Sequence, residues 1–477
     1  MSSLTDTLTA SGGTESAGFL NDIISHLWPN INVAGCRMVK DIVEPMFAQM
    51  LPGPLKSLHF VKLDLGKVPL KVSNVDVHKT DKEGIKLDMD VDWDGRCDIE
   101  LDGKMIPKMG IEHIKLKGRL SVLMCPITDV IPLIGALQVA FINPPSLKLD
   151  FTDAISIADI DMIENSIKKV ILNIIGGMAV LPNRYLVKMN SNNDYFKTFV
   201  PHVGMIRITV ECATGINGPK KSGVKKLLDK IAKDIPDCYC KVSVGAEEPW
   251  RTSTVKNKHD PQWNETHDFL VMDHDQCILI DVNDEDTDSD DDIGIALTTV
   301  RQLLLSNGTQ ELDLTHRGQP TGAKARVHAK FFNLVLDAGN LSAQGAEGKD
   351  AICGVANVLV AGADGLEGRK EDLNPSVKVT WGDKTFNTAA KTYTPGTDIF
   401  SPDFDTAFTV PITSAMLENP GSFKISLMNK TEETGSKEIS FQDVVNAPDM
   451  TLEDSFDIGS GQTVKAGIVL RGVQAAH

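Results

Sequence analysis

The stretch Cys277–Ala296, CILIDVNDEDTDSDDDIGIA, sets two apolar runs on either side of a strongly acidic loop. Eight acidic residues and no basic residue lie between Asp281 and Asp292. Two like charges about 4 Å apart repel each other by roughly 4 kcal/mol at an effective dielectric near 20. The composition therefore indicates either a loop that spreads its carboxylates into water or a loop that binds a cation.

Carboxylate oxygens on a short loop suit a hard cation, and Ca²⁺ accepts the irregular coordination that several of them provide. The pattern of a helical calcium loop does not fit this stretch. Counted from Asp284, its sixth position is Ser289 where glycine is required, and its twelfth is Ile295 where glutamate is required. A calcium site here would therefore use another kind of loop.

The segments before the acidic loop extend the pattern. Asp237 lies in IPDCYCKVSV, and TSTVKNK (252–258), DPQWNE (260–265) and THDFLVM (266–272) follow in that order. Together with VNDEDTDSDDDIG (282–294), this order resembles a C2 domain, a calcium- and phospholipid-binding β-sandwich. The resemblance implies Ca²⁺ ligands at Asp237, Asp284, Asp286 and Asp291, with Asp229 and Asp234 as candidates for one further ligand.

An insertion in the first loop of this domain, PKKSGVKKLLDKIAKDIP (219–236), departs from the family pattern. Its apolar residues recur at helical spacing, which predicts a short basic amphipathic helix. The insertion lysines, which lie mainly elsewhere on the helical wheel, are Lys225, Lys226, Lys230 and Lys233. Such a helix either rests on the domain's own surface or dips into an anionic membrane, and the sequence leaves both open.

A second, weaker C2-like pattern follows an Ala/Gly-rich linker. It contains VANVLVAGADGLEG (355–368), NPSVKVTWGDKTFNT (374–388), SPDFDTAFTV (401–410) and FKISLMNKTEETGSKEIS (423–440). At the positions of the metal ligands it has Asn374, Asn429 and Thr431. Because calcium affinity depends on the number of charged ligands, we expect calcium to act through the first of the two domains only.

The N-terminal part of the chain combines helical and strand-like patterns. Helical spacing predicts one helix that begins near Phe19 and stops at Pro29, and a second from about Ile31 to Met50. Between Leu58 and Phe151 apolar residues alternate with polar ones, which predicts long half-buried strands. A further apolar stripe at helical spacing covers residues 160–174.

Four segments of this region resemble an SMP (synaptotagmin-like, mitochondrial, lipid-binding protein) domain. They are SAGFLNDIISHLWPNINVAGCRMVKDIVEPM (16–46), LKSLHFVKLDLGKVP (55–69), CPITDVIPLIGALQVAFINPPSLKLDF (125–151) and MAVLPNRYLV (178–187). The resemblance implies a TULIP-like fold, in which a strongly curved sheet with helices forms an elongated tube that carries glycerophospholipid acyl chains.

The alternating strands supply candidates for the lipid-facing side of such a tube. An apolar inner face stabilises acyl chains by about 0.8 kcal/mol for each buried CH₂ group. The same alternation also suits an ordinary protein core, and periodicity alone does not separate the two. The candidate lipid-facing residues are Leu120, Val122, Met124, Leu137, Val139, Phe141, Leu147, Leu149 and Phe151.

The chain is therefore predicted to be an α+β multidomain protein, in which a curved-sheet lipid-binding tube precedes two all-β sandwiches. A length of 477 residues with 42% hydrophobic residues provides material for several packed cores. The predicted parts are a disordered polar leader (1–17), an SMP domain (18–192), a C2 domain (203–336), a linker (337–350) and a degenerate C2 domain (351–475).

Composition excludes several other classes of protein. A net charge of −17 argues against nucleic acid as a partner, because phosphate binding requires a basic face. The eight cysteines are scattered, which indicates reduced thiols. The sequence has neither an apolar run long enough to span a membrane nor a signal peptide, and it has no GxxxxGK[ST], HExxH or GxSxG motif. We therefore expect a protein that is not an enzyme.

An SMP domain followed by C2 domains resembles the extended synaptotagmins, tricalbins and plant synaptotagmins. The resemblance implies lipid transfer at endoplasmic reticulum–plasma membrane contact sites, on the cytoplasmic side of the membranes. It also implies an SMP-mediated homodimer and calcium-dependent docking of the first C2 domain on anionic membrane. The family's N-terminal membrane anchor is not apparent in this chain, so attachment to the endoplasmic reticulum stays open. The alternative is a calcium-responsive scaffold whose SMP-like domain dimerises without carrying lipid.

Overall fold

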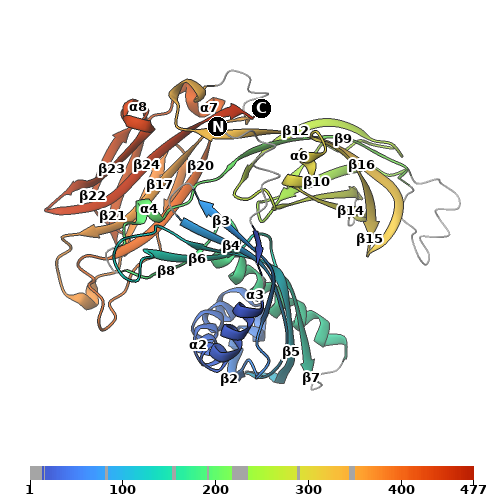
Figure 1. Cartoon of the computed structure of the whole chain (residues 1–477), viewed down its shortest axis with the longest axis horizontal. Coiled ribbons are helices and arrows are strands. Elements are labelled where there is room, and N and C mark those ends of the chain that lie inside the picture. The colour runs from blue at the N-terminus through green and yellow to red at the C-terminus, as the bar shows by residue number, and fades with distance from the viewer. Residues whose placement is uncertain are drawn as a thin grey trace.

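The computed structural model describes residues 13–15, 17–80, 84–152, 157–190, 193–216, 235–286, 290–342 and 350–476. An N-terminal domain of one curved sheet and two long helices lies below two β-sandwiches, which lie side by side above it (Figure 1).

The N-terminal domain is built around an eight-stranded antiparallel sheet with the order β1-β3-β4-β5-β6-β8, in which β2 pairs with β4 and β7 with β5. Its strands are β1 (Gly13–Glu15), β2 (His59–Asp64), β3 (Lys71–Thr80), β4 (Gly84–Gly103), β5 (Ile106–Met124), β6 (Ala136–Phe141), β7 (Ser146–Thr152) and β8 (Tyr185–Lys188). Its helices are α2 (Gly18–Met50), the 3₁₀ turn η1 (Gly53–Ser57) and α3 (Ile157–Ala179). The long alternating strands and the helix after them are confirmed; β3 lies within the same region, but residues 71–80 were not among the alternating runs.

The expected helix stop at Pro29 is wrong, because α2 continues through Pro29 and Pro45. A proline inside a helix removes one backbone hydrogen bond and costs about 3 kcal/mol. Tertiary packing beside the first proline opposes this cost. Trp28 is 5% exposed, its ring centroid lies 5.5 Å from that of Trp93, and its Nε1–H donates to the carbonyl oxygen of Gly66 at 2.9 Å.

The predicted disordered leader (1–17) also needs a correction. Gly13–Glu15 forms β1, which pairs antiparallel with β3 in the register Gly13↔Val77. Edge pairing joins backbone groups and needs no side-chain pattern. Three residues are too few to show a period-two signal, so the sequence could not reveal this strand.

The first sandwich contains β9 (Gly204–Thr214), β10 (Cys238–Val244), β11 (Trp250–Arg251), β12 (Gln262–Val271), β13 (Cys277–Asp284), β14 (Asp291–Thr299), α6 (Val300–Leu305), β15 (Thr309–His316) and β16 (Gln319–Val335). Alternate residues of its strands point inward and form one core cluster, in which Ile208, Val242 and Ile280 are fully buried. The short helix α4 (Tyr195–Thr198) precedes this sandwich, and the 3₁₀ turn η2 (Ala338–Asn340) follows it.

The second sandwich packs the sheet β19-β18-β21-β22 against β17, β20, β23 and β24 around a separate core. Its strands are β17 (Ile352–Asp364), β18 (Pro375–Trp381), β19 (Lys384–Asn387), β20 (Asp403–Thr413), β21 (Ser422–Asn429), β22 (Glu432–Ser440), β23 (Thr451–Gly459) and β24 (Gln462–Ala475). Its short helices are η3 (Lys370–Asp372), α7 (Ser414–Glu418), α8 (Phe441–Asn446) and η4 (Pro448–Met450).

The three domains contact one another through backbone strand pairing and through salt bridges. Strand β16 of the first sandwich pairs with β24 of the second in the register Phe332↔Ala475 to Val335↔Gly472, which makes their sheets continuous. At the N-terminal domain, Lys86 Nζ lies 2.5 Å from Asp273 Oδ2 of the first sandwich. The Nζ atom of Lys188 lies 2.6 Å from Asp405 Oδ2 of the second sandwich. The N-terminal sheet is thus held against both sandwiches.

Candidate functional site

Two of the predicted calcium ligands meet at one end of the first sandwich. Strands β10 and β13 are antiparallel neighbours, and their register sets Cys238 opposite Asp284. The backbone N–H of Asp237 donates to Asp284 Oδ1 at 2.7 Å, and Asp237 Oδ1 accepts from the backbone N–H of Asn257, also at 2.7 Å. Asp284 is only 5% exposed. The fold therefore brings together two acidic residues that lie far apart in the sequence, and it buries one of them.

The remaining predicted ligands lie around this pair or outside the described residues. Asp291, on β14, is opposite Asp284 in the register, and Asp286 follows the end of β13. Asp229, Asp234 and the insertion lysines fall outside the described residues. Among the residues described, three or more His, Cys, Asp or Glu side chains do not gather closely enough to hold a metal ion.

Two residues near the acidic loop, Tyr239 and Arg251, were missed by the sequence reasoning. Tyr239 Oη donates to Asp290 Oδ2 at 2.6 Å, and this hydrogen bond holds the pKa of Asp290 below its usual range. The guanidinium of Arg251 lies over the Tyr239 ring, 3.7 Å from its centroid, and pairs with Glu285. The loop contains no base of its own, but β11 supplies one from the side. Only the pairing of β11 with β10 brings Arg251 there, so no local signal identified it.

The second sandwich repeats this geometry with neutral side chains. The backbone N–H of Asn374 donates to Asn429 Oδ1 at 2.7 Å, and Pro375 is opposite Asn429 in the register of β18 and β21. The backbone N–H of Lys430 donates to the carbonyl oxygen of Asn374 at 3.1 Å, as that of Glu285 does to Asp237 at 2.9 Å. Asn374 and Asn429 therefore occupy the positions of Asp237 and Asp284, and the two sandwiches differ there in charge.

This donor set suits Ca²⁺ in its chemistry. The oxygens of Asp237 and Asp284 are carboxylate oxygens, which hard divalent cations prefer. Both side chains accept backbone N–H groups, and these bonds orient them at one end of the sandwich. A bound cation would offset the cost of desolvating the buried Asp284 carboxylate. The first sandwich therefore has a candidate cation site at this end.

A second candidate site is the inward face of the N-terminal sheet, which carries an apolar row across five strands. Directly paired residues point to the same side of a sheet. The successive pairs of this row are Val77↔Leu87, Leu87↔Val122, Val122↔Val139 and Val139↔Tyr185. A parallel row runs through Ile85↔Met124, Met124↔Leu137 and Leu137↔Val187, and a third through Met89↔Leu120 and Leu120↔Phe141.

The predicted residues on β7 share this face but lie at its covered end. The register pairs Leu147 with Leu116 and Leu149 with Ile114, which alternate in phase with Leu120 along β5. Helices α2 and α3 lie against this end (Figure 1), and Leu147 and Leu149 belong to the same core cluster as residues of both helices. Here the apolar residues fill a protein core, which was the alternative that periodicity left open.

At the other end the apolar face is partly open. Val77 is 37% exposed, Tyr185 40% and Val187 38%. A row of apolar side chains on a sheet is normally covered by other parts of the protein. The exposed part of this row is therefore a candidate binding surface for an apolar ligand.

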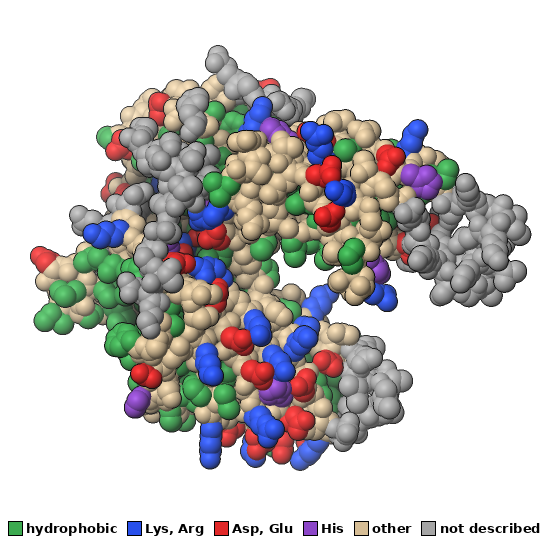
Figure 2. Space-filling view, turned by 45° about the vertical axis from the view of Figure 1, so that its right-hand side comes forward, with side chains coloured by type: hydrophobic (Ala, Val, Ile, Leu, Met, Phe, Trp, Pro, Cys, Tyr) green, Lys and Arg blue, Asp and Glu red, His purple; other side chains and the backbone are tan. Residues whose placement is uncertain are grey.

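The outward face of β4 and β5 has the opposite character. It carries cross-strand ion pairs, with Lys117 2.8 Å from Asp92 and Arg119 2.9 Å from Asp90. Figure 2 shows acidic and basic side chains interspersed over the visible surface of the N-terminal domain, at the bottom of the view. On β4 and β5 the outward face is therefore polar in this part, whereas the inward face is apolar.

The models of two domain families match this chain, and their ranges agree with the three domains of the structure. The family model of the Synaptotagmin-like mitochondrial-lipid-binding domain (SMP) matches residues 13–190. The model of the C2 domain matches residues 204–314 and 354–450. The chain is thus an α+β multidomain protein with an SMP domain followed by two C2 domains, as the sequence predicted.

Over nearly its whole length the chain is similar to the extended synaptotagmins. It is 27% identical to Extended synaptotagmin-2 of Mus musculus over 484 residues, which cover 96% of this chain and 55% of that protein. It is 30% identical to Extended synaptotagmin-2-A of Xenopus laevis over 288 residues, which cover 59% of this chain and 32% of that protein. The prediction of an extended synaptotagmin-like chain is confirmed, and the chain spans about half the length of the mouse and human relatives.

A solved structure shows the same fold. The structure of the SMP domain and two C2 domains of Extended-Synaptotagmin 2 covers 97% of this chain and 100% of that chain, with a TM-score of 0.64 and 24% sequence identity. No helix in the described part of this chain is long and apolar enough to cross a membrane.

Proposed function

We propose that this chain is a non-enzymatic carrier of glycerophospholipids between membranes at contact sites, by way of its SMP domain. The observation that carries the proposal is the apolar row on β3, β4, β5, β6 and β8, which is continuous across the sheet and open at the β8 end. Acyl chains laid on this row would replace water, at about 0.8 kcal/mol for each CH₂ group. The headgroup would stay at the open side.

We further propose that the first C2 domain docks on the anionic, cytoplasmic surface of a membrane when Ca²⁺ is bound by Asp237, Asp284, Asp286 and Asp291. A bound divalent cation reverses the sign of the acidic loop and permits contact with anionic headgroups. The carboxylate pair of the first C2 domain supports this role, and the amide pair of the second serves as its comparison. An SMP-mediated homodimer and a position between endoplasmic reticulum and plasma membrane belong to the same proposal.

Fluorescent lipid transfer between donor and acceptor liposomes tests the carrier function. Val139→Trp fills the middle of the apolar row and should lower the transfer rate at least several-fold. Lys148→Trp is the matched control, because Lys148 is exposed on β7 in the opposite phase to Leu147 and Leu149, and it should transfer lipid at the wild-type rate. Native mass spectrometry of purified protein should show bound glycerophospholipid.

If wild-type protein stays free of lipid after incubation with liposomes and transfers none with or without calcium, the carrier proposal fails. A calcium-responsive scaffold that does not carry lipid would then be the better description.

A further inference from the structure

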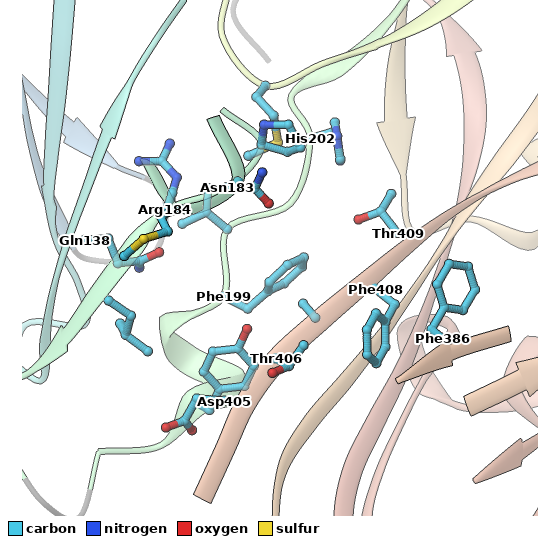
Figure 3. Close-up of a pocket in the computed structure, with 18 residues that line it drawn as sticks. Gln138, Asn183, Arg184, Phe199, His202, Phe386, Asp405, Thr406, Phe408 and Thr409 are labelled. Carbon is cyan, nitrogen blue, oxygen red and sulfur yellow. The ribbon is translucent and has the colours of Figure 1, made fainter. Parts of the chain in front are cut away.

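A cavity of about 520 Å³ lies between the SMP domain and the second C2 domain. Its walls come from β6, β8, the end of α3, the segment 195–202 and β20 (Figure 3). Gln138 and Leu186 line it, and they alternate with Leu137, Val139 and Tyr185 along their strands, so they belong to the outward face of the sheet. The cavity is therefore separate from the apolar row, and its volume lies within the roughly 300–1,000 Å³ range of small-ligand sites.

One end of this cavity carries a guanidinium, that of Arg184, with no direct hydrogen bond or salt bridge to the described residues. Part of the Arg184 side chain remains accessible, but its Nε and Nη1 atoms are shielded from solvent and make no hydrogen bond to any residue that the structure describes. Desolvation lowers the pKa of this guanidinium. The carboxylates whose charge acts on it, Asp88 and Asp273, both hold Lys86 instead, at 2.9 and 2.5 Å.

Two further groups near this end, His202 and Arg471, add no negative charge to it. His202 is 8% exposed, and its Nδ1 atom is buried without a hydrogen-bond partner among the described residues. Burial, together with the nearby guanidinium of Arg471, lowers the pKa of His202 to about 4, so the ring is neutral at pH 7. Arg471 donates to the amide oxygen of Asn357 at 2.8 Å and pairs with no carboxylate in the described part of the chain.

The rest of the cavity is lined by apolar side chains, by neutral polar ones such as Gln138 and Thr409, and by one carboxylate that is already paired. Figure 3 shows Phe199 between the Arg184 end and the Asp405 end, with Phe408 across from it on β20. Leu186 and Met272 also line the walls. The only carboxylate that the structure places among the lining residues, Asp405, pairs with Lys188 at 2.6 Å and lies away from Arg184. The cavity thus combines a cationic end with a body of apolar and neutral polar side chains.

We propose that this cavity binds an anionic amphiphile, whose phosphate or carboxylate is held by Arg184 and whose apolar part lies between Phe199 and Phe408. A guanidinium presents several N–H donors in one plane and suits either anion. Both the SMP domain and the second C2 domain contribute walls, so the ligand stabilises their contact. The site is independent of calcium and of the lipid-carrying face.

The test uses the full chain and compares its thermal stability and its native mass spectrum with three soluble probes. The probes are dihexanoyl phosphatidate, dihexanoyl phosphatidylcholine and inorganic phosphate, each below the concentration at which it forms micelles. We expect phosphatidate to raise the melting temperature and to add one bound molecule per chain whose binding depends on Arg184. Arg184→Gln should weaken this binding at least tenfold, and Lys148→Gln, which removes an exposed lysine elsewhere on the SMP domain, should leave it unchanged.

A second variant and the remaining probes separate this site from the lipid-carrying face and from a purely structural role of Arg184. Val139→Trp, on the opposite face of the sheet, should keep the response to phosphatidate that depends on Arg184. Inorganic phosphate that binds as tightly as phosphatidate would overturn the assignment of an amphiphile. A third outcome would also overturn the site: no probe stabilises wild-type protein, and Arg184→Gln lowers the melting temperature. Arg184 would then be part of a water-bridged ion pair.

Discussion

Replacing Asp284 and Asp286 by Asn should abolish the calcium response of this protein and leave the calcium-free fold nearly as stable as the wild type. The hydrogen bond from the Asp237 N–H to residue 284 should survive, because Asn429 accepts the corresponding bond at the same distance of 2.7 Å in the second C2 domain. Exchanging a charged acceptor for a neutral one costs about 1 kcal/mol. Removing two carboxylates from a crowded acidic loop offsets part of this cost.

The loss of calcium binding should be much larger. At a calcium concentration about 100-fold above the dissociation constant, a ligand that binds only the folded state stabilises it by about 2.7 kcal/mol. For a domain of this size, this stabilisation corresponds to a rise of roughly 10 °C in Tm. The double variant should show neither the rise in Tm nor the heat of calcium binding in titration calorimetry.

The second C2 domain supplies the matched control. Asn429→Asp restores one carboxylate opposite Pro375, but Asn374 stays neutral, so a single charge should not create a calcium site. Calcium heat retained in the Asp284/Asp286 double variant, or traced to the second C2 domain in the wild type, would refute the assignment of the acidic loop.

Three further predictions concern the insertion, a buried histidine and the junction between the C2 domains. Changing the four insertion lysines to Gln should weaken liposome binding most at low salt, by about 1 kcal/mol for each lysine that lies close to an anionic surface; equal affinity at low salt would exclude this role. Because the folded-state pKa of His202 is lowered from 6.5 to about 4, its stabilising contribution is complete above pH 6.5 and declines as pH falls toward 4. Urea unfolding should therefore show a loss of roughly 2–3 kcal/mol over that range, absent in His202→Gln. Asp268→Asn leaves a buried arginine without its carboxylate and should cost about 3 kcal/mol, whereas Arg326→Gln, at a surface ion pair, should cost less than about 1 kcal/mol in the same assay.

Much of the fold was predictable from local pattern. Period-two alternation marked β4, β5, β6 and β7 because one face of each strand is apolar over most of its length. The acidic loop was visible because its charge is contiguous in the sequence. Strand β3 was missed, and the helix stop at Pro29 was wrong. Proline locally disfavours a continuing helix, as the sequence indicated. At Pro29 this preference is opposed by the burial of Trp28 against Trp93, which lies 65 residues away.

The sequence by itself determined which residues carry charge and which alternate, and so determined the domain types and the difference in ligand charge between the two C2 domains. Only the tertiary structure decided which part of the apolar sheet face is covered by α2 and α3 and which part stays open at β8. It also set Arg251 beside the acidic loop and left Arg184, at a cavity wall, without a direct hydrogen bond or salt bridge to the described residues. The physical reason is that periodicity reports only which side of a strand is apolar. Whether that side meets a helix, water or a ligand depends on residues that are distant in the chain and close in space.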